Sequence, residues 1–151
     1  MDRVALLRLL EDRDRRRRDE ALMQWQEAVR QAESADAQAK ALEAYRSEYR
    51  ERWSAQFKQS APIEIIRCYQ GFVERLDQAI GSQQATVDNH AARVTAARER
   101  LKQREIKLAT VQRLIDRRLR AATQVVQRRE QKASDEAAQR MRRAGLTLAS
   151  M

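Results

Sequence analysis

Apolar residues recur at intervals of three and four through the first third of the chain. Ten positions on this template, between residues 21 and 53, read Ala, Trp, Ala, Ala, Ala, Ala, Leu, Arg, Tyr and Trp, so that nine of the ten are apolar. This spacing places residues on one face of a helix and is typical of a coiled-coil seam. Because no Gly or Pro interrupts it, the pattern predicts a first helix over about residues 3–57.

A second seam has an apolar residue at every seventh position without exception, at Val73, Ile80, Val87, Val94, Leu101, Leu108, Ile115 and Ala122. Pro62 disfavours helix at the preceding residue and suits the first turn of a new helix. These features predict a turn at about residues 58–62 and a second helix over about 62–143. The repeat continues through Gly81, which favours one helix over a second chain reversal there. Gly145 is a plausible stop, after which Leu146–Met151 is expected to fray.

The predicted fold is all-α: an elongated antiparallel two-helix coiled coil, a helical hairpin whose second helix is the longer, forming a single domain over residues 1–151. Composition agrees, since 35% of the residues are charged and there are only three glycines and one proline. A globular fold needs more turn residues than that. Folding at the turn matches residue 3 with about residue 118, so the distal half of the second helix is expected to lack a partner.

Two short stripes of residues are mirror images about Pro62. The spacings four, three and four recur on both sides, and antiparallel pairing gives residue numbers that always sum to 121. All eight residues should therefore lie at matched heights on one surface of the hairpin. One interpretation is a core widened by aromatics; the other, which we favour, is a half-exposed patch that binds a partner. The stripes are Gln38, Leu42, Tyr45 and Tyr49 on the first helix, and Phe72, Leu76, Ala79 and Gln83 on the second.

The net charge of +9 is concentrated in one segment. Residues 93–143 hold sixteen Lys or Arg and six Asp or Glu, whereas the rest of the chain holds fifteen and sixteen. The arginines at 15–18 are offset by acidic neighbours and indicate a solvated helix face. We expect the basic arm to face an acidic partner through Arg113, Arg117, Arg118, Arg120, Arg128 and Arg129.

No catalytic chemistry is recognisable in the sequence. Three glycines do not form a phosphate-binding loop, and the sole His90 and sole Cys68 belong to no metal-ligand motif. We therefore predict no enzyme activity, no catalytic residues, no metal and no cofactor. A single cysteine favours a reducing cytosol, no segment is apolar enough to span a membrane, and the charged N-terminus is not that of a signal peptide.

The residues around the stripes resemble a known family. The run YRSEYR at 45–50, followed by YQGFVERLDQAI at 69–80, is similar to the FliJ family pattern YxxEYR … YQxFIxxLexAI. The resemblance covers essentially the whole chain without gaps. It implies a component of the bacterial flagellar type III protein export apparatus, and with it flagellum biogenesis, motility and chemotaxis.

The resemblance also implies partners and a place in the cell. It implies a rod like the central stalk of rotary ATPases, in the pore of the hexameric flagellar export ATPase, whose turn reaches toward the cytoplasmic domain of the export-gate membrane protein. It further implies escort of export chaperones. The gate-binding surface carries over to the eight residues of the mirrored stripes. The expected location is cytoplasmic, at the inner membrane at the flagellar base and attached only through partners.

Other functions remained open on the sequence alone. Similar rods serve virulence (injectisome) type III secretion systems. A basic coiled coil that binds nucleic acid fits the charge, but every aromatic residue lies before residue 73, away from the basic segment. Independent membrane attachment through Val4–Leu10 and Arg13–Arg18 is disfavoured because acidic neighbours offset those arginines.

Overall fold

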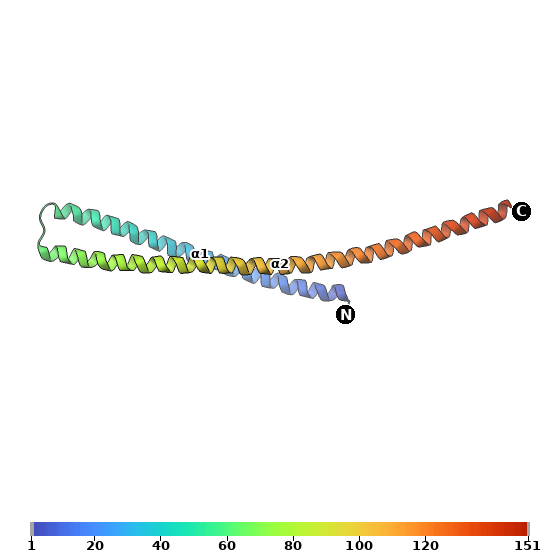
Figure 1. Cartoon of the computed structure of the whole chain (residues 1–151), viewed down its shortest axis with the longest axis horizontal. Coiled ribbons are helices and arrows are strands. Elements are labelled where there is room, and N and C mark those ends of the chain that lie inside the picture. The colour runs from blue at the N-terminus through green and yellow to red at the C-terminus, as the bar shows by residue number, and fades with distance from the viewer. Residues whose placement is uncertain (1, 151) are drawn as a thin grey trace. The chain divides into compact units, whose positions relative to one another are not determined.

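The chain consists of two helices. In a computed structural model that describes residues 2–150, α1 spans Arg3–Phe57 and α2 spans Ile63–Ala149, and those residues contain no strand (Figure 1). The predicted all-α fold with a longer second helix is confirmed, and α1 has the predicted bounds. Helix α2 runs without a break through Gly71 and Gly81, as the uninterrupted heptad repeat favoured.

The fold divides into two compact units, each with a part of both helices. One unit is Arg17–Arg104, which contains the chain reversal and is an antiparallel helical hairpin. The other holds the residues up to Arg16 and those from Glu105 onward. Within each unit the two helices pack against each other, so each unit has its own part of the predicted seams.

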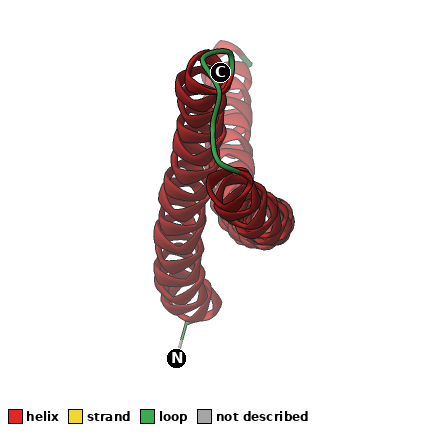
Figure 2. Ribbon diagram, turned by 90° about the vertical axis from the view of Figure 1, so that its left-hand side faces the viewer, coloured by secondary structure: helices red, strands yellow, loops and turns green. Residues whose placement is uncertain are grey.

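The chain reverses in a short loop, drawn in green in Figure 2. The last turn of α1 tightens here, because the Gln59 amide donates to the Gln56 carbonyl at 3.1 Å. Ser60 then takes a φ of 83°, a left-handed conformation that reverses the chain. The Pro62 carbonyl accepts from the amides of Ile65 at 3.1 Å and Ile66 at 3.3 Å, so Pro62 immediately precedes α2 and begins its hydrogen-bond ladder.

The core of the Arg17–Arg104 unit follows the predicted seams. All ten seam positions of α1 between residues 21 and 53 are buried or half-buried, as are those of α2 from Val73 to Leu101. The most buried side chains are mainly small, and such side chains allow close approach of the two helices. They are Ala21, Ala35, Ala39, Leu76, Ala97 and Leu101.

Two polar groups interrupt this core. The Trp25 indole Nε1 and the His90 Nδ1 are both buried, and neither has a hydrogen-bond partner among the described residues. An unpaired buried polar atom costs free energy of folding, about 1–3 kcal/mol in typical cases. His90 occupies a seam position between Val87 and Val94, so the cost arises where the sequence departs from the apolar repeat.

In the other unit the core is short. Leu108 and Ile115 of α2 are buried, and Asp14 of α1 is only 4% exposed, with Arg13 Nη2 3.4 Å from its carboxylate. Every described residue after Ile115 is exposed, including the predicted seam residue Ala122. The buried part of the α2 seam therefore ends at Ile115, close to the predicted match of residue 3 with residue 118.

The predicted end of α2 is wrong. The helix passes Gly145 and continues to Ala149, about six residues beyond the expected boundary, and the Ser150 amide donates to the Leu146 carbonyl at 3.1 Å. Gly145 does not adopt the left-handed conformation that ends helices at glycine. It instead remains helical, at a cost of about 1 kcal/mol relative to alanine. The predicted tail included Met151, which lies outside the described residues, as does Met1.

A membrane-spanning helix requires a long, predominantly apolar segment of about 18 residues or more. No helix within residues 2–150 meets that requirement.

Candidate functional site

Six aromatic side chains form a cluster next to the chain reversal. Tyr49 is at its centre: its ring centroid lies 4.6 Å from that of Phe72 and 5.6 Å from that of Tyr69, both on α2. Tyr45 meets the edge of Phe72 at 6.4 Å. At the turn end, Phe57 contacts Tyr69 in a T-shaped geometry at 5.1 Å. Such pairs add about 0.5–1.5 kcal/mol each beyond the area they bury, so the cluster ties the two helices together.

Sequence reasoning named only part of this cluster as a site. Trp53 was assigned to the seam and Tyr69 to the family pattern, while Phe57 was not singled out. A simple signal was present, because aromatics occur at every fourth residue of α1 from position 45 to 57. Residues four apart lie on neighbouring turns of one helical face. That spacing predicts ring contacts along α1. The structure has them as a stacked pair, Tyr45 and Tyr49, and as two tilted pairs, Tyr49 with Trp53 and Trp53 with Phe57.

The structure brings the two mirrored stripes together. At the end nearer the turn the Tyr49 ring packs against the Phe72 ring in a tilted geometry, and at the far end the Gln83 side-chain amide donates to Gln38 Oε1 at 3.4 Å. Both are pairs whose numbers sum to 121. Gln83 Nε2 also donates to the Ala35 carbonyl at 2.9 Å, which fixes the register of α2 on α1 by a polar contact. The antiparallel pairing of the stripes therefore holds at both of their ends.

The stripe residues differ in exposure, so the patch is part core and part surface. Leu76 is 7% exposed and belongs to the core. Leu42, Tyr49, Phe72 and Gln83 are half-buried, whereas Gln38, Tyr45 and Ala79 are exposed. Tyr45, with 48% of its surface accessible, is the large apolar side chain most available to a partner. The stripes thus pack the helices and also form part of the surface, and binding of a partner to that surface stays a prediction.

One ion pair joins the helices within this region. Arg46, the single polar residue on the predicted α1 seam, has its Nε 2.8 Å from Asp77 Oδ1 of α2. Its N–H does not point along that line, so the contact is an ion pair without an aligned hydrogen bond. Both side chains are partly exposed, so screening limits the contribution to stability. The pair explains how a charged residue is tolerated at a seam position.

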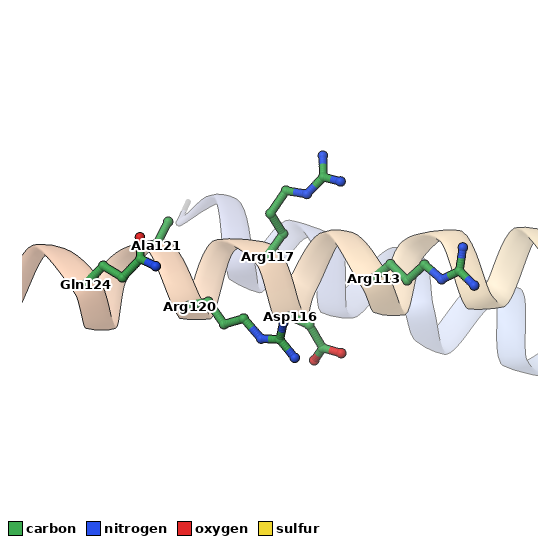
Figure 3. Close-up of a pocket in the computed structure, with 6 residues that line it drawn as sticks. All are labelled: Arg113, Asp116, Arg117, Arg120, Ala121 and Gln124. Carbon is green, nitrogen blue, oxygen red and sulfur yellow. The ribbon is translucent and has the colours of Figure 1, made fainter.

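The six basic residues predicted to face a partner are all exposed on α2. The structure separates them, because only three line one shallow depression of about 470 Å³ (Figure 3). Their spacing of four and three places these three on one helical face. Asp116, one helical turn before Arg120, lines the same depression (Figure 3). The depression is lined by Arg113, Asp116, Arg117, Arg120, Ala121 and Gln124, and it does not include Arg118, Arg128 or Arg129.

Metal ions in proteins are held by clusters of His, Cys, Asp or Glu side chains. Among residues 2–150 no group of three or more His, Cys, Asp or Glu side chains is placed to hold a metal ion. The surfaces that the structure offers are instead an aromatic patch on a helical hairpin and a basic helical face. Exposed aromatic patches and charged helical faces are surfaces of the kind through which proteins bind other macromolecules.

Comparison with known families identifies the class more closely. The family model described as "Flagellar FliJ protein" matches residues 4–146, nearly the whole chain. The chain belongs to the FliJ family and is a component of the flagellar protein export apparatus. No match was found among curated proteins or among solved structures.

Proposed function

We propose that this protein links the flagellar export ATPase to the export gate and escorts export chaperones. The proposed gate-binding surface is the exposed part of the mirrored stripes near the turn. The proposed ATPase-binding surface is the face of the basic segment of α2 that carries Arg113, Arg117 and Arg120. In this role the protein is the central-stalk-like component of the export apparatus, at the cytoplasmic face of the inner membrane and held there by its partners. Membership of the FliJ family supports the setting.

One observation carries the gate-binding proposal. A half-exposed aromatic, Tyr45, lies on a framework of packed rings that both helices supply. Rigid aromatic side chains at the centre of a patch are the residues that dominate binding energy at protein interfaces. Because Tyr49 and Phe72 hold the Tyr45 ring in place, it loses little conformational freedom on binding.

The test is binding of the purified export-gate cytoplasmic domain, measured by calorimetry, together with motility on soft agar. We expect Tyr45→Ala with Ala79→Glu to lower affinity by about tenfold or more, because the pair removes one anchor and places a charge on the opposite helix of the patch. The control is Ser47→Ala with Gln78→Glu, which changes exposed residues of the same helices off the stripe. Equal affinity of the two variants contradicts the assignment.

The proposed ATPase contact rests on electrostatics. Arg113, Arg117 and Arg120 present three like charges on one face with a single carboxylate, Asp116, among them. No ion pair engages the three arginines within the part of the chain that the structure describes. Such a face attracts an acidic surface and increases the rate of association at low salt.

A further inference from the structure

The matched face of the hairpin extends away from the turn, beyond the stripes. The rule that pairs Gln38 with Gln83 also pairs Ala28 with Arg93 and Gln24 with Ala97, since both sums are again 121. These four residues line one groove of about 550 Å³ in the Arg17–Arg104 unit. The face on which the mirrored stripes lie therefore continues into a groove between α1 and α2.

The floor of this groove is made of small side chains. Ala97 is 3% exposed and Ala28 is half-buried, so neither side chain fills the space above the seam. Met23 projects at the edge of the groove with 69% of its surface accessible. Small residues let another helix approach closely, and an exposed methionine adapts its shape to an apolar partner. The floor and edge thus fit the apolar face of a third helix.

The two walls carry opposite charge at the heptad interval. Glu20 and Glu27 stand seven residues apart on α1, and Arg93 and Arg100 stand seven residues apart on α2. Residues seven apart lie on the same side of a coiled-coil helix. Glu27 is partly neutralised by Arg30, whereas Glu20, Arg93 and Arg100 form no ion pair within residues 2–150. These three side chains are therefore available to form ion pairs with a partner.

We infer that this groove is a second docking site, distinct from the proposed gate and ATPase surfaces, and that its occupant is an amphipathic helix of a partner protein. The helix has small or aliphatic residues facing Ala28 and Ala97. It carries acidic residues seven apart on the side facing Arg93 and Arg100, and basic residues seven apart on the side facing Glu20 and Glu27. The hairpin with its occupant then forms a three-helix coiled coil over this stretch.

The probe is a synthetic helical peptide of about four heptads, with an alanine and leucine stripe, glutamate along one flank and lysine along the other. Binding to the full-length protein is measured by fluorescence anisotropy at low salt. We expect Arg93→Glu with Arg100→Glu to weaken binding by about tenfold, the loss of two rim ion pairs. The control is Arg98→Glu with Lys102→Glu, which makes the same change of net charge at exposed positions outside the groove and should change the affinity by less than about twofold.

A four-residue variant separates charge pattern from net charge. Adding Glu20→Lys and Glu27→Lys to the double variant exchanges the charges of the two walls. The same peptide then fits with its direction reversed, so we expect most of the affinity to return. Circular dichroism checks that each variant keeps its helicity.

Three outcomes overturn the proposal. They are no binding of the peptide to the unmodified protein, equal binding to the groove and control variants, and failure of the four-residue exchange to restore affinity. Sedimentation of the protein alone tests a different occupant. A dimer that forms with rising concentration and is lost on reversing Arg93 and Arg100 assigns the groove to a second copy of the chain. Because neither gate nor ATPase is present, the result is independent of the proposed function.

Discussion

Tyr49 of α1 lies against Phe72 of α2, with ring centroids 4.6 Å apart, while its neighbour Tyr45 leaves nearly half of its surface in solvent. Two tyrosines four residues apart on one helix thus have different tasks. Tyr49 packs the two helices together, and Tyr45 is exposed and available to a partner. The difference arises because the seam of α1 passes through Tyr49, whereas Tyr45 flanks it.

Replacing each of the two tyrosines by alanine should lower the free energy of unfolding by a different amount. We expect Tyr49→Ala to lower the free energy of unfolding by about 2 kcal/mol or more, since it removes ring contacts with Tyr69 and Phe72. Tyr45→Ala should cost about 1 kcal/mol, because its ring is nearly half exposed and its contacts with Tyr49 and Phe72 are longer, at 6.2 and 6.4 Å between centroids. Urea unfolding followed by circular dichroism measures both. Equal losses contradict the division into a packing residue and a surface residue.

The basic face of α2 gives a prediction for the export ATPase. Replacing Arg113, Arg117 and Arg120 by glutamate should weaken ATPase binding and stimulation by about tenfold, because it changes the charge of this face from positive to negative. The matched control reverses Arg118, Arg129 and Arg140, which are eleven residues apart and lie along a different face of the same helix. Both variants change the net charge equally. If they impair the ATPase equally, net charge rather than the depression decides the interaction.

His90 should be a position where the protein can gain stability. Replacing it by leucine completes the apolar repeat between Val87 and Val94 and removes a buried Nδ1 that has no partner. We expect the free energy of unfolding to rise by about 1–2 kcal/mol, which is seen as a higher Tm. Asn89→Leu is the control. Because residue 89 is exposed, this substitution should change the free energy of unfolding by less than about 0.5 kcal/mol. A lower Tm for His90→Leu is the contrary result.

The chain reversal offers a test of backbone strain. Ser60 holds a φ of 83°, which costs a residue with a Cβ about 1–2 kcal/mol, whereas glycine adopts it freely. Ser60→Gly should therefore stabilise the hairpin by about 0.5–1 kcal/mol after the added freedom of the unfolded chain is subtracted. Gln59→Gly, one residue earlier, should not. Thermal unfolding of the two variants decides between them, and a gain at residue 59 alone contradicts the assignment of strain to Ser60.

The sequence by itself determined the helices and most of the seam. The three-four spacing of α1, the seven-residue repeat of α2 and the single Pro62 fixed two helices and one reversal, because periodicity and turn chemistry are local properties of the chain. Antiparallel pairing then followed from a short connection, and with it the meeting of Tyr49 with Phe72 and of Gln38 with Gln83. The predicted end of the second helix near Gly145 was wrong, because glycine permits a helix to end without requiring it.

Tertiary structure alone decided exposure and the division of charged residues into faces. Leu76 and Ala79 belong to one stripe, yet one is buried and the other is exposed, because the depth of a side chain depends on how closely the facing helix approaches. In the same way Arg113, Arg117 and Arg120 share a depression that Arg118 does not line. The antiparallel pairing also places Ala28 opposite Arg93 and Gln24 opposite Ala97, but only the tertiary structure showed a groove there, since the space between two helices depends on how their side chains pack.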